Sequence, residues 1–161
     1  MAVRTIRVVP DPVLRKKAKK VSSVDASVQR LINDMIDTLH DASGAGLAAP
    51  QIGVLLRIVV IEVPDRETYV LINPEIVKKE GERIVDEGCL SIPGYWGEIK
   101  RSQKVKVKAL DKTGKPIRIT GEELLGQALE HEIDHLNGVL YTDYLESSDR
   151  LYKITEQNAG E

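Results

Sequence analysis

The sequence contains few cysteines and few aromatic residues. It has one cysteine, Cys89, together with one tryptophan, five tyrosines and no phenylalanine. A single cysteine excludes an internal disulfide. Because aromatic residues are scarce, the core must rest on Val, Ile, Leu and Ala.

No apolar run approaches the roughly 20 residues of a membrane span, and charges near the N-terminus interrupt the apolar segment that a signal peptide needs. We expect a cytoplasmic protein without a membrane partner.

The sequence also lacks an excess of positive charge. Its 161 residues include 23 Lys and Arg against 25 Asp and Glu, which gives a net charge of −2. Proteins dedicated to nucleic acid are usually strongly basic, so we expect no specific nucleic-acid partner. No linker or repeat divides the chain, and its length suits one compact domain. We predict a single domain over residues 1–161, with a short C-terminal tail from about residue 147.

An amphipathic helix is predicted near the N-terminus. Apolar residues recur at helical spacing from Val28 to Leu39, and Ser23, Asp25 and Ser27 are candidate caps at its start. Segments rich in β-branched residues predict strands. These segments are Arg4–Val9, Arg57–Val63, Tyr69–Asn73, Ile76–Lys79, Arg83–Asp86, Lys104–Lys108 and Pro116–Thr120.

A second helix is predicted to begin after Thr120, as its N-cap, and to end at Asn137-Gly138. Its apolar residues occupy several faces, which is typical of a buried helix. The same helix carries four ionisable side chains: His131, Glu132, Asp134 and His135. Such groups are costly in a core unless they are paired or bound to a metal, so this conflict marks a candidate site.

The spacing of the two histidines predicts a metal site. His131 and His135 are four residues apart and share one helix face, while Glu132 lies on an adjacent face, where it can touch a metal-bound water. A catalytic site of this kind has three protein ligands and one open position. Cys89 is the best third ligand, because His40 is explained by its place at the end of the first helix.

Other interpretations of these residues remain open. The histidines could be a hydrogen-bonded core pair, or the chain could be a structural metal domain without an open position. A zinc metallopeptidase would instead need a downstream ligand, for which Glu146 is the candidate. Asp134 would either support the metal ligands from behind or form a buried ion pair, for which Arg101 is one choice of partner. The alternating lysines Lys104, Lys106 and Lys108 form either a solvated strand face or an RNA contact.

A loop of small residues runs from Gly44 to Gln51. It contains the pattern G-x-G-x-x-A, but it follows a helix instead of a strand and leads into Pro50, so we reject a dinucleotide site. Gly44 and Gly46 lack a Cβ atom, which would let the backbone of a substrate lie against the loop. Gln51 would then offer a neutral amide donor.

Three segments taken together resemble the peptide deformylase family: Gly44–Gln51, Glu87–Ser91 and His131–His135, in this order. The resemblance covers nearly the whole chain. It implies an α+β fold in which antiparallel β-sheets pack around the ligand-bearing helix. It also implies a metal-dependent hydrolase that removes the N-formyl group from the formylmethionine of newly made polypeptides and releases formate.

The resemblance also implies roles for individual residues. Cys89, His131 and His135 would hold one divalent metal ion, typically Fe²⁺, although Zn²⁺, Ni²⁺ or Co²⁺ can take its place. Glu132 would be the general acid and base, and Gln51 with the backbone N–H of Leu90 would form the oxyanion hole. Gly46 would lie beside the bound peptide. N-formylmethionyl nascent peptides are the implied substrates, with a transient ribosome contact as a further expectation.

The peptide pocket is less constrained by the sequence. Leu124 and Ala128 precede His131 on its helix face, so they either line a pocket for the methionine side chain or simply pack in the core. The chain departs from the usual family pattern at four positions, none of which is a fixed residue of the motifs, and these departures bear on peptide preference beyond the first residue. These positions are Ala45, Trp96, Gln127 and Glu130.

Overall fold

The computed structural model describes residues 2–64 and 66–154. It contains two α-helices, α1 (Ala26–Ala42) and α2 (Glu123–Leu136), and four short 3-10 helices, η1 (Pro12–Arg15), η2 (Ala49–Ile52), η3 (Tyr141–Tyr144) and η4 (Ser148–Arg150). The strands are β1 (Gly46–Ala48), β2 (Ile58–Ile61), β3 (Tyr69–Glu80), β4 (Arg83–Cys89), β5 (Ile92–Arg101), β6 (Lys104–Leu110), β7 (Pro116–Glu122) and β8 (Leu151–Lys153).

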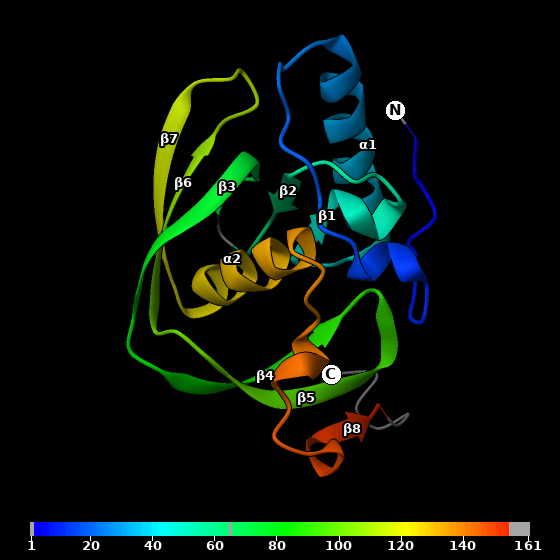
Figure 1. The fold of residues 1–161 in the computed structure, drawn as a ribbon, viewed down its shortest axis with the longest axis vertical. Coiled ribbons are helices and arrows are strands. Elements are labelled where there is room, and N and C mark those ends of the chain that lie inside the picture. Colours follow the sequence, from blue (N-terminus) through cyan, green and yellow to red (C-terminus); the bar gives the residue numbers. More distant parts are fainter. Residues whose placement is uncertain (1, 65, 155–161) are drawn as a thin grey trace.

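The strands form two antiparallel sheets. One has the order β1-β2-β3-β6-β7 and the other the order β4-β5-β8. Helix α2 lies between the two sheets, and α1 packs on the other face of the larger one (Figure 1). The predicted α+β fold, with antiparallel sheets around the second helix, is therefore confirmed.

Strand β2 shows how alternation builds the two cores. Ile58 and Val60 face α1, where Met35 and Leu39 are fully buried, because successive side chains point to opposite faces. Val59 and Ile61 face α2 and pack with the apolar side chains of that helix. All four residues of β2 are buried. Each buried aliphatic side chain contributes roughly 1.5–3 kcal/mol, so the center of the larger sheet is fixed from both sides.

The start of α1 is capped as predicted. The Asp25 side chain accepts a hydrogen bond from the backbone N–H of Val28 at 3.0 Å, which satisfies one of the free donors of the first turn.

The predicted cap of α2 is wrong. Thr120 lies inside β7, opposite Lys106, and the hairpin with β6 continues to Glu122, which occupies the N-cap position. The chain then enters the helix through Glu123 with a positive φ of 51°. A Cβ atom on Gly126 would lie 2.8 Å from the carbonyl oxygen of Gly121. Glycine at this position therefore allows the strand and the helix to meet closely.

The predicted strand Arg4–Val9 is also wrong. Its backbone hydrogen bonds go to a side chain, a 3-10 helix and a turn instead of a neighbouring strand. The N–H of Arg4 donates to Thr38 Oγ1 at 2.9 Å, that of Arg7 to the carbonyl of Gln51 at 2.6 Å, and that of Val9 to the carbonyl of Ser91 at 2.9 Å. The segment thus ties α1 to η2, which carries Gln51, and to the turn that carries Ser91.

In the part of the chain that the structure describes, no helix is both long and apolar enough to cross a membrane.

Candidate metal centre and active site

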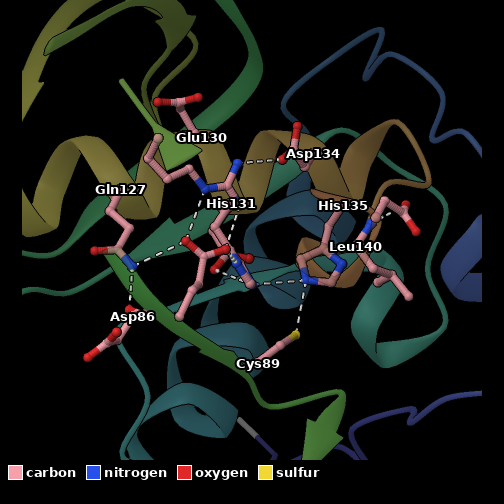
Figure 2. Close-up of polar contacts among 12 residues, drawn as sticks. Asp86, Cys89, Gln127, Glu130, His131, Asp134, His135 and Leu140 are labelled. Atoms are coloured by element: carbon pink, nitrogen blue, oxygen red, sulfur yellow. Dashed lines mark hydrogen bonds and ion pairs between the residues drawn. The ribbon is translucent and has the colours of Figure 1, made fainter. Parts of the chain in front are cut away.

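The structure brings Cys89, His131 and His135 together. The two histidines lie one turn apart on α2, and Cys89 is the last residue of β4. Cys89 Sγ lies 3.2 Å from His135 Nε2, which lies 3.2 Å from His131 Nε2 (Figure 2). The three ligand atoms lie within 4.8 Å of one another, and no other group of this kind is found among the described residues.

This donor set fits a divalent transition metal. Ligand atoms at the usual 2.0–2.3 Å from a tetrahedral ion lie roughly 3.3–3.6 Å from each other, close to the two separations of 3.2 Å. One thiolate and two imidazoles favour zinc, iron or a related metal over calcium or magnesium. The three side chains therefore form a group of suitable composition and size to hold one such ion.

The tautomer of His131 is set by Glu87. Oxygen Oε2 of Glu87 accepts a hydrogen bond from Nδ1 of His131 at 2.7 Å. This hydrogen bond leaves Nε2 of His131 directed at the other ligand atoms, as is usual for histidines that bind metals.

The Glu87 carboxylate is surrounded by donors. It also accepts hydrogen bonds from Arg101 Nε at 3.0 Å and from Gln127 Nε2 at 3.2 Å. Burial alone would raise the pKa of Glu87, but the hydrogen bonds from His131 and Arg101 lower it to about 2. Glu87 is therefore ionised, and its charge acts on the ring of His131.

Arg101 connects Glu87 to Asp134. Its Nη1 donates to Asp134 Oδ2 at 2.7 Å, and its guanidinium carbon lies 4.9 Å from the centre of the Tyr144 ring. Burial would lower the pKa of Arg101, but the carboxylates of Glu87 and Asp134 raise it above its ordinary value. The ion pair that the sequence left open for Asp134 is thus present.

Glu132 lies beside the three ligand residues. It is 3% exposed, and its Oε2 atom is 4.0 Å from His131 Nε2. Burial raises the pKa of Glu132 to about 7. Its other oxygen, Oε1, is buried and accepts no hydrogen bond from any described residue.

Gly46 makes room for Glu132. A Cβ atom on Gly46 would lie 2.5 Å from Oε2 and 2.9 Å from Cγ of Glu132, so any larger residue would displace the carboxylate. The structure thus explains why strand β1 approaches the site with a glycine.

Gln51 also points at the site. Its Oε1 accepts a hydrogen bond from the N–H of Ala48 at 2.9 Å, which orients the amide. Its Nε2 then donates to Ser91 Oγ at 3.1 Å and lies 3.7 Å from Cys89 Sγ. Leu90 follows Cys89 in the turn between β4 and β5, so its backbone lies close to the same sulfur.

A cavity of about 500 Å³ opens onto these groups. Gly44, Gly46 and Gln51 line one side, and Leu124, Gln127 and Ala128 of α2 line another. Ala128 is 6% exposed and Leu124 is 44% exposed, so Leu124 stands at the mouth and is not part of the core. The volume is ordinary for a small-molecule or peptide pocket.

Two residues considered in the sequence lie elsewhere. His40 pairs with Glu62 at 2.6 Å and is about half exposed, which agrees with a structural role. Glu146 lines a separate hollow with Ile84 and Arg150. Glu146 therefore does not join the two histidines, and the metallopeptidase arrangement is not present.

The four departures from the family pattern have different surroundings. Ala45 and Gln127 line the cavity. Trp96 stacks on Tyr152 with ring centres 4.5 Å apart. Glu130 is buried and accepts a hydrogen bond from the N–H of Ser102 at 2.7 Å, so it holds the turn between β5 and β6.

Glu87 is the residue to which the sequence analysis gave no role. A signal was available, because side chains two apart on a strand share a face: if Cys89 points at the helix, so does Glu87. A buried acid at such a position needs a partner. His131 and Arg101 are the partners that the structure shows.

Comparison with known proteins agrees with this geometry. The family model described as polypeptide deformylase matches residues 3–151. A peptide deformylase of Dehalococcoides mccartyi strain CBDB1 is 61% identical over 155 residues, which are 96% of this chain and 93% of that protein. One of Alkaliphilus metalliredigens is 52% identical over 143 residues, which are 89% of this chain and 97% of that protein.

Solved structures give the same result. A peptide deformylase from Legionella pneumophila superposes with a TM-score of 0.89 at 54% identity, covering 92% of this chain and 89% of that one. One from Synechococcus elongatus in complex with actinonin has a TM-score of 0.88 at 39% identity, covering 91% and 81%. The chain belongs to the polypeptide deformylase family of enzymes.

Proposed function

We propose that this protein removes the N-formyl group from the formylmethionine at the start of newly made polypeptides and releases formate. The observation that carries the proposal is the convergence of Cys89, His131 and His135, with Glu132 beside them, next to one cavity that Cys89, His131 and Glu132 line. Membership of the deformylase family supports it.

Cys89, His131 and His135 would hold one divalent metal ion, and we propose Fe²⁺ in the cell, with Zn²⁺, Ni²⁺ or Co²⁺ as substitutes. Such an ion polarises a carbonyl group and lowers the pKa of a water that it binds. The cysteine supports the choice of a transition metal, because thiolate is a soft ligand.

Glu132 would move the proton. Its oxygen Oε1 is buried, has no partner among the described residues, and belongs to a side chain that lines the cavity. We propose that Glu132 takes a proton from the attacking water and then gives a proton to the leaving amine. The water oxygen forms a bond to the formyl carbon, the bond from that carbon to nitrogen breaks, and the products are formate and a free N-terminus.

Gln51 and the backbone N–H of Leu90 would stabilise the charge that develops on the formyl oxygen. The hydrogen bond from Ala48 fixes the Gln51 amide with its amino group toward Cys89. A donor that is already oriented needs no reorganisation during the reaction, and losing one typically costs about 10²–10³ in rate.

Gly44 and Gly46 would lie along the backbone of the substrate, and Leu124 and Ala128 would contact the methionine side chain. All four line the same cavity. The substrate is the beginning of a new polypeptide, so we propose that the protein works in the cytoplasm.

Transient contact with a ribosome stays a prediction. The lysines considered for RNA contact are partly neutralised, because Lys104 lies 3.9 Å from Glu122 and Lys108 lies 3.5 Å from Glu75. Such exposed pairs contribute little to stability.

The test is formate release from formyl-Met-Ala-Ser by protein purified without oxygen, with the metal content measured on the same sample. We expect one formate for each new amino terminus and loss of activity after chelation. Unformylated Met-Ala-Ser is the control. Cleavage of its peptide bonds, or no formate from a fully metal-loaded protein, would refute the proposal. Cys89→Ala should lose most of its metal, and a variant with full occupancy would remove Cys89 from the ligand set.

A further inference from the structure

A surface segment near the N-terminus contacts two buried residues of the site through its backbone. This segment, Arg4–Val9, which we call the brace, has mostly exposed side chains. The N–H of Arg7 donates to the carbonyl of Gln51 at 2.6 Å, and the N–H of Val9 donates to the carbonyl of Ser91 at 2.9 Å. Gln51 and Ser91 are 1% and 0% exposed. The carbonyl of a buried residue needs a hydrogen-bond donor, and the brace supplies one to each.

The brace connects two pieces of the fold that belong to different sheets. Gln51 lies in η2, which directly follows β1 of the larger sheet, whereas Ser91 lies in the turn between β4 and β5 of the smaller sheet. The same turn carries Leu90. The brace therefore contacts both pieces that carry the proposed oxyanion donors.

Both ends of the brace are anchored. At its start, the Arg4 guanidinium donates to Asp34 Oδ2 of α1 from Nε at 2.9 Å and from Nη2 at 2.7 Å. At its other end, the N–H of Asp11 donates to the carbonyl of Val8 at 3.0 Å, directly before η1. A segment that is already fixed at both ends loses little further conformational entropy when its central N–H groups form hydrogen bonds. The brace can therefore hold η2 and the turn at a fixed separation.

The orientation of the Gln51 amide depends on where its backbone lies. The amide itself is held at two points, because Oε1 accepts from the N–H of Ala48 at 2.9 Å and Nε2 donates to Ser91 Oγ at 3.1 Å. The hydrogen bond from Arg7 fixes the backbone from which this side chain extends. A displacement of about 1 Å that originates away from the reacting atoms can cost about 10² in rate.

We propose that Arg7 is a positioning residue of this reaction, because its main-chain N–H holds η2 so that the Gln51 amide stays directed at the formyl oxygen. The inference rests on the proposed function, in which Gln51 stabilises charge that develops in the transition state. It predicts a loss of kcat without a loss of substrate binding. The competing outcome is a purely structural role, in which the brace stabilises the fold without acting on the amide.

A proline at position 7 removes the N–H, so the experiment compares Arg7→Pro with Arg7→Ala. Both variants lose the ion pair of Arg7 with Asp11 at 3.0 Å, but only Arg7→Pro loses the donor to Gln51. With formyl-Met-Ala-Ser as substrate, kcat should be about tenfold lower in Arg7→Pro than in Arg7→Ala, and KM should agree within about twofold.

Val8→Pro is the matched control. The N–H of Val8 donates to no other residue in the described part of the chain, so a proline there changes the brace without removing a hydrogen bond. Its kcat should stay within about twofold of the wild-type value. Equal kcat values in Arg7→Pro and Arg7→Ala would overturn the inference, and so would a loss confined to KM.

The same comparison in Gln51→Ala separates positioning from a structural role. If Arg7 acts through the Gln51 amide, Arg7→Pro should lower kcat by less than about twofold when that amide is already absent, because the two substitutions remove the same interaction. A purely structural role predicts the same tenfold loss in both backgrounds, and that result would overturn the inference.

Hydrogen exchange of the metal-free protein tests the brace without turnover. The N–H groups of Gly53 and Val54 bond to the carbonyls of Pro50 and Ala49 at 3.0 and 3.1 Å, so their exchange reports local opening of η2. It should be about fivefold faster in Arg7→Pro than in Arg7→Ala, as expected for the loss of one hydrogen bond, while the amides of β3 keep their rates. Equal exchange at η2 would overturn the inference.

Arg4→Gln is a second variant, because it weakens the anchor of the brace at Asp34. It should accelerate exchange at η2 and lower kcat in the same direction as Arg7→Pro. If Arg7→Pro does not fold, wild-type exchange together with wild-type kcat in Arg4→Gln would overturn the inference. If the metal-loaded wild type releases no formate, the proposed function fails, whereas the exchange measurement still decides whether the brace holds η2.

Discussion

Replacing Glu87 with glutamine tests how the ligand residues are held in place. The Glu87 side chain is 3% exposed, and its two oxygens accept hydrogen bonds from His131, Arg101 and Gln127. Glutamine has the same shape but offers one acceptor oxygen and one amino group. At least one of the donors of His131, Arg101 and Gln127 would therefore face the amino group of the new glutamine, which is also a donor. We expect Glu87→Gln to loosen His131 and to weaken the pairing of Arg101.

The magnitude follows from the pKa of Glu87. Burial opposes ionisation, yet the hydrogen bonds from His131 and Arg101 lower this pKa from 4.5 to about 2. A difference of about 2.5 units corresponds to about 3 kcal/mol of unfolding free energy at neutral pH. Removing one partner of a buried ion pair costs a similar amount, roughly 3–5 kcal/mol. The two estimates of the loss of unfolding free energy therefore agree.

The pH dependence has a definite sign. A carboxyl group whose folded pKa is lowered stabilises the protein fully above its unfolded pKa and loses this contribution as the pH falls through its folded pKa. For Glu87 the loss falls between about pH 4.5 and pH 2. The difference in unfolding free energy between metal-free wild type and Glu87→Gln should be about 3 kcal/mol at pH 7 and should shrink below pH 4.5.

Urea unfolding of both metal-free proteins at pH 7 and pH 3 measures this difference, and competition with a chelator measures the metal affinity. Loss of a hydrogen-bond partner behind a metal-binding histidine typically costs 10–100-fold in affinity. Glu82→Gln, at an exposed acid between β3 and β4, is the control and should stay within about 0.5 kcal/mol. A Glu87→Gln protein that matches wild type in both measurements would refute the reasoning.

Three further substitutions test the proposed roles. Glu132→Gln should keep its metal and lose at least about 10² in kcat, as measured by metal analysis and formate release; loss of the metal would instead make Glu132 a ligand. Gln51→Ala should lower kcat by about 10²–10³, and an unchanged rate would exclude it from the oxyanion hole. Gly46→Ala places a Cβ 2.5 Å from the Glu132 carboxylate. We therefore expect about a 10²-fold loss of rate, with the metal retained. Wild-type turnover would show that the carboxylate can move freely.

The sequence predicted the helices better than the sheets. The apolar residues from Val28 to Leu39 repeat every three or four positions, and the observed α1 covers all of them. Predicted strands Tyr69–Asn73 and Ile76–Lys79 are one strand, β3, which runs through Pro74 with irregular pairing to β6. Such an irregularity lets a strand continue past a proline, and no local pattern reveals it.

Three strands had no local signal. β1 consists of Gly46, Leu47 and Ala48, which have no particular strand propensity, and it forms because β2 offers a paired edge. β5 contains Pro93 and two glycines, and β8 has only three residues within the predicted tail. β1 and β8 depend on pairing with segments further away in the chain, which a sequence window cannot show, whereas β5 pairs with β4, the strand directly before it.

The residues of the site were accessible to sequence reasoning because their spacing is local. His131 and His135 share a helix face by geometry alone, whereas the approach of Cys89 spans 42 residues and could only be proposed as a third ligand. The contacts of Glu87 with Arg101 and Gln127 needed the fold, because three elements meet there. Local periodicity thus predicts which residues can act together, and the tertiary structure shows what holds them.

The two parts of the site differ in how firmly they are held. Both ends of α2 are fixed, because Gly121 and Gly126 pack in close contact at its start and Arg57 donates to the carbonyl of Leu136 at 3.0 Å at its end. Of the three proposed ligand residues, His131 and His135 are buried on α2 and Cys89 is partly buried at the end of β4, which suits chemistry that tolerates displacements of only about 0.5 Å. At the mouth of the cavity, Tyr95 and Leu124 are 41% and 44% exposed. Substitutions at these two positions should therefore leave the metal site intact.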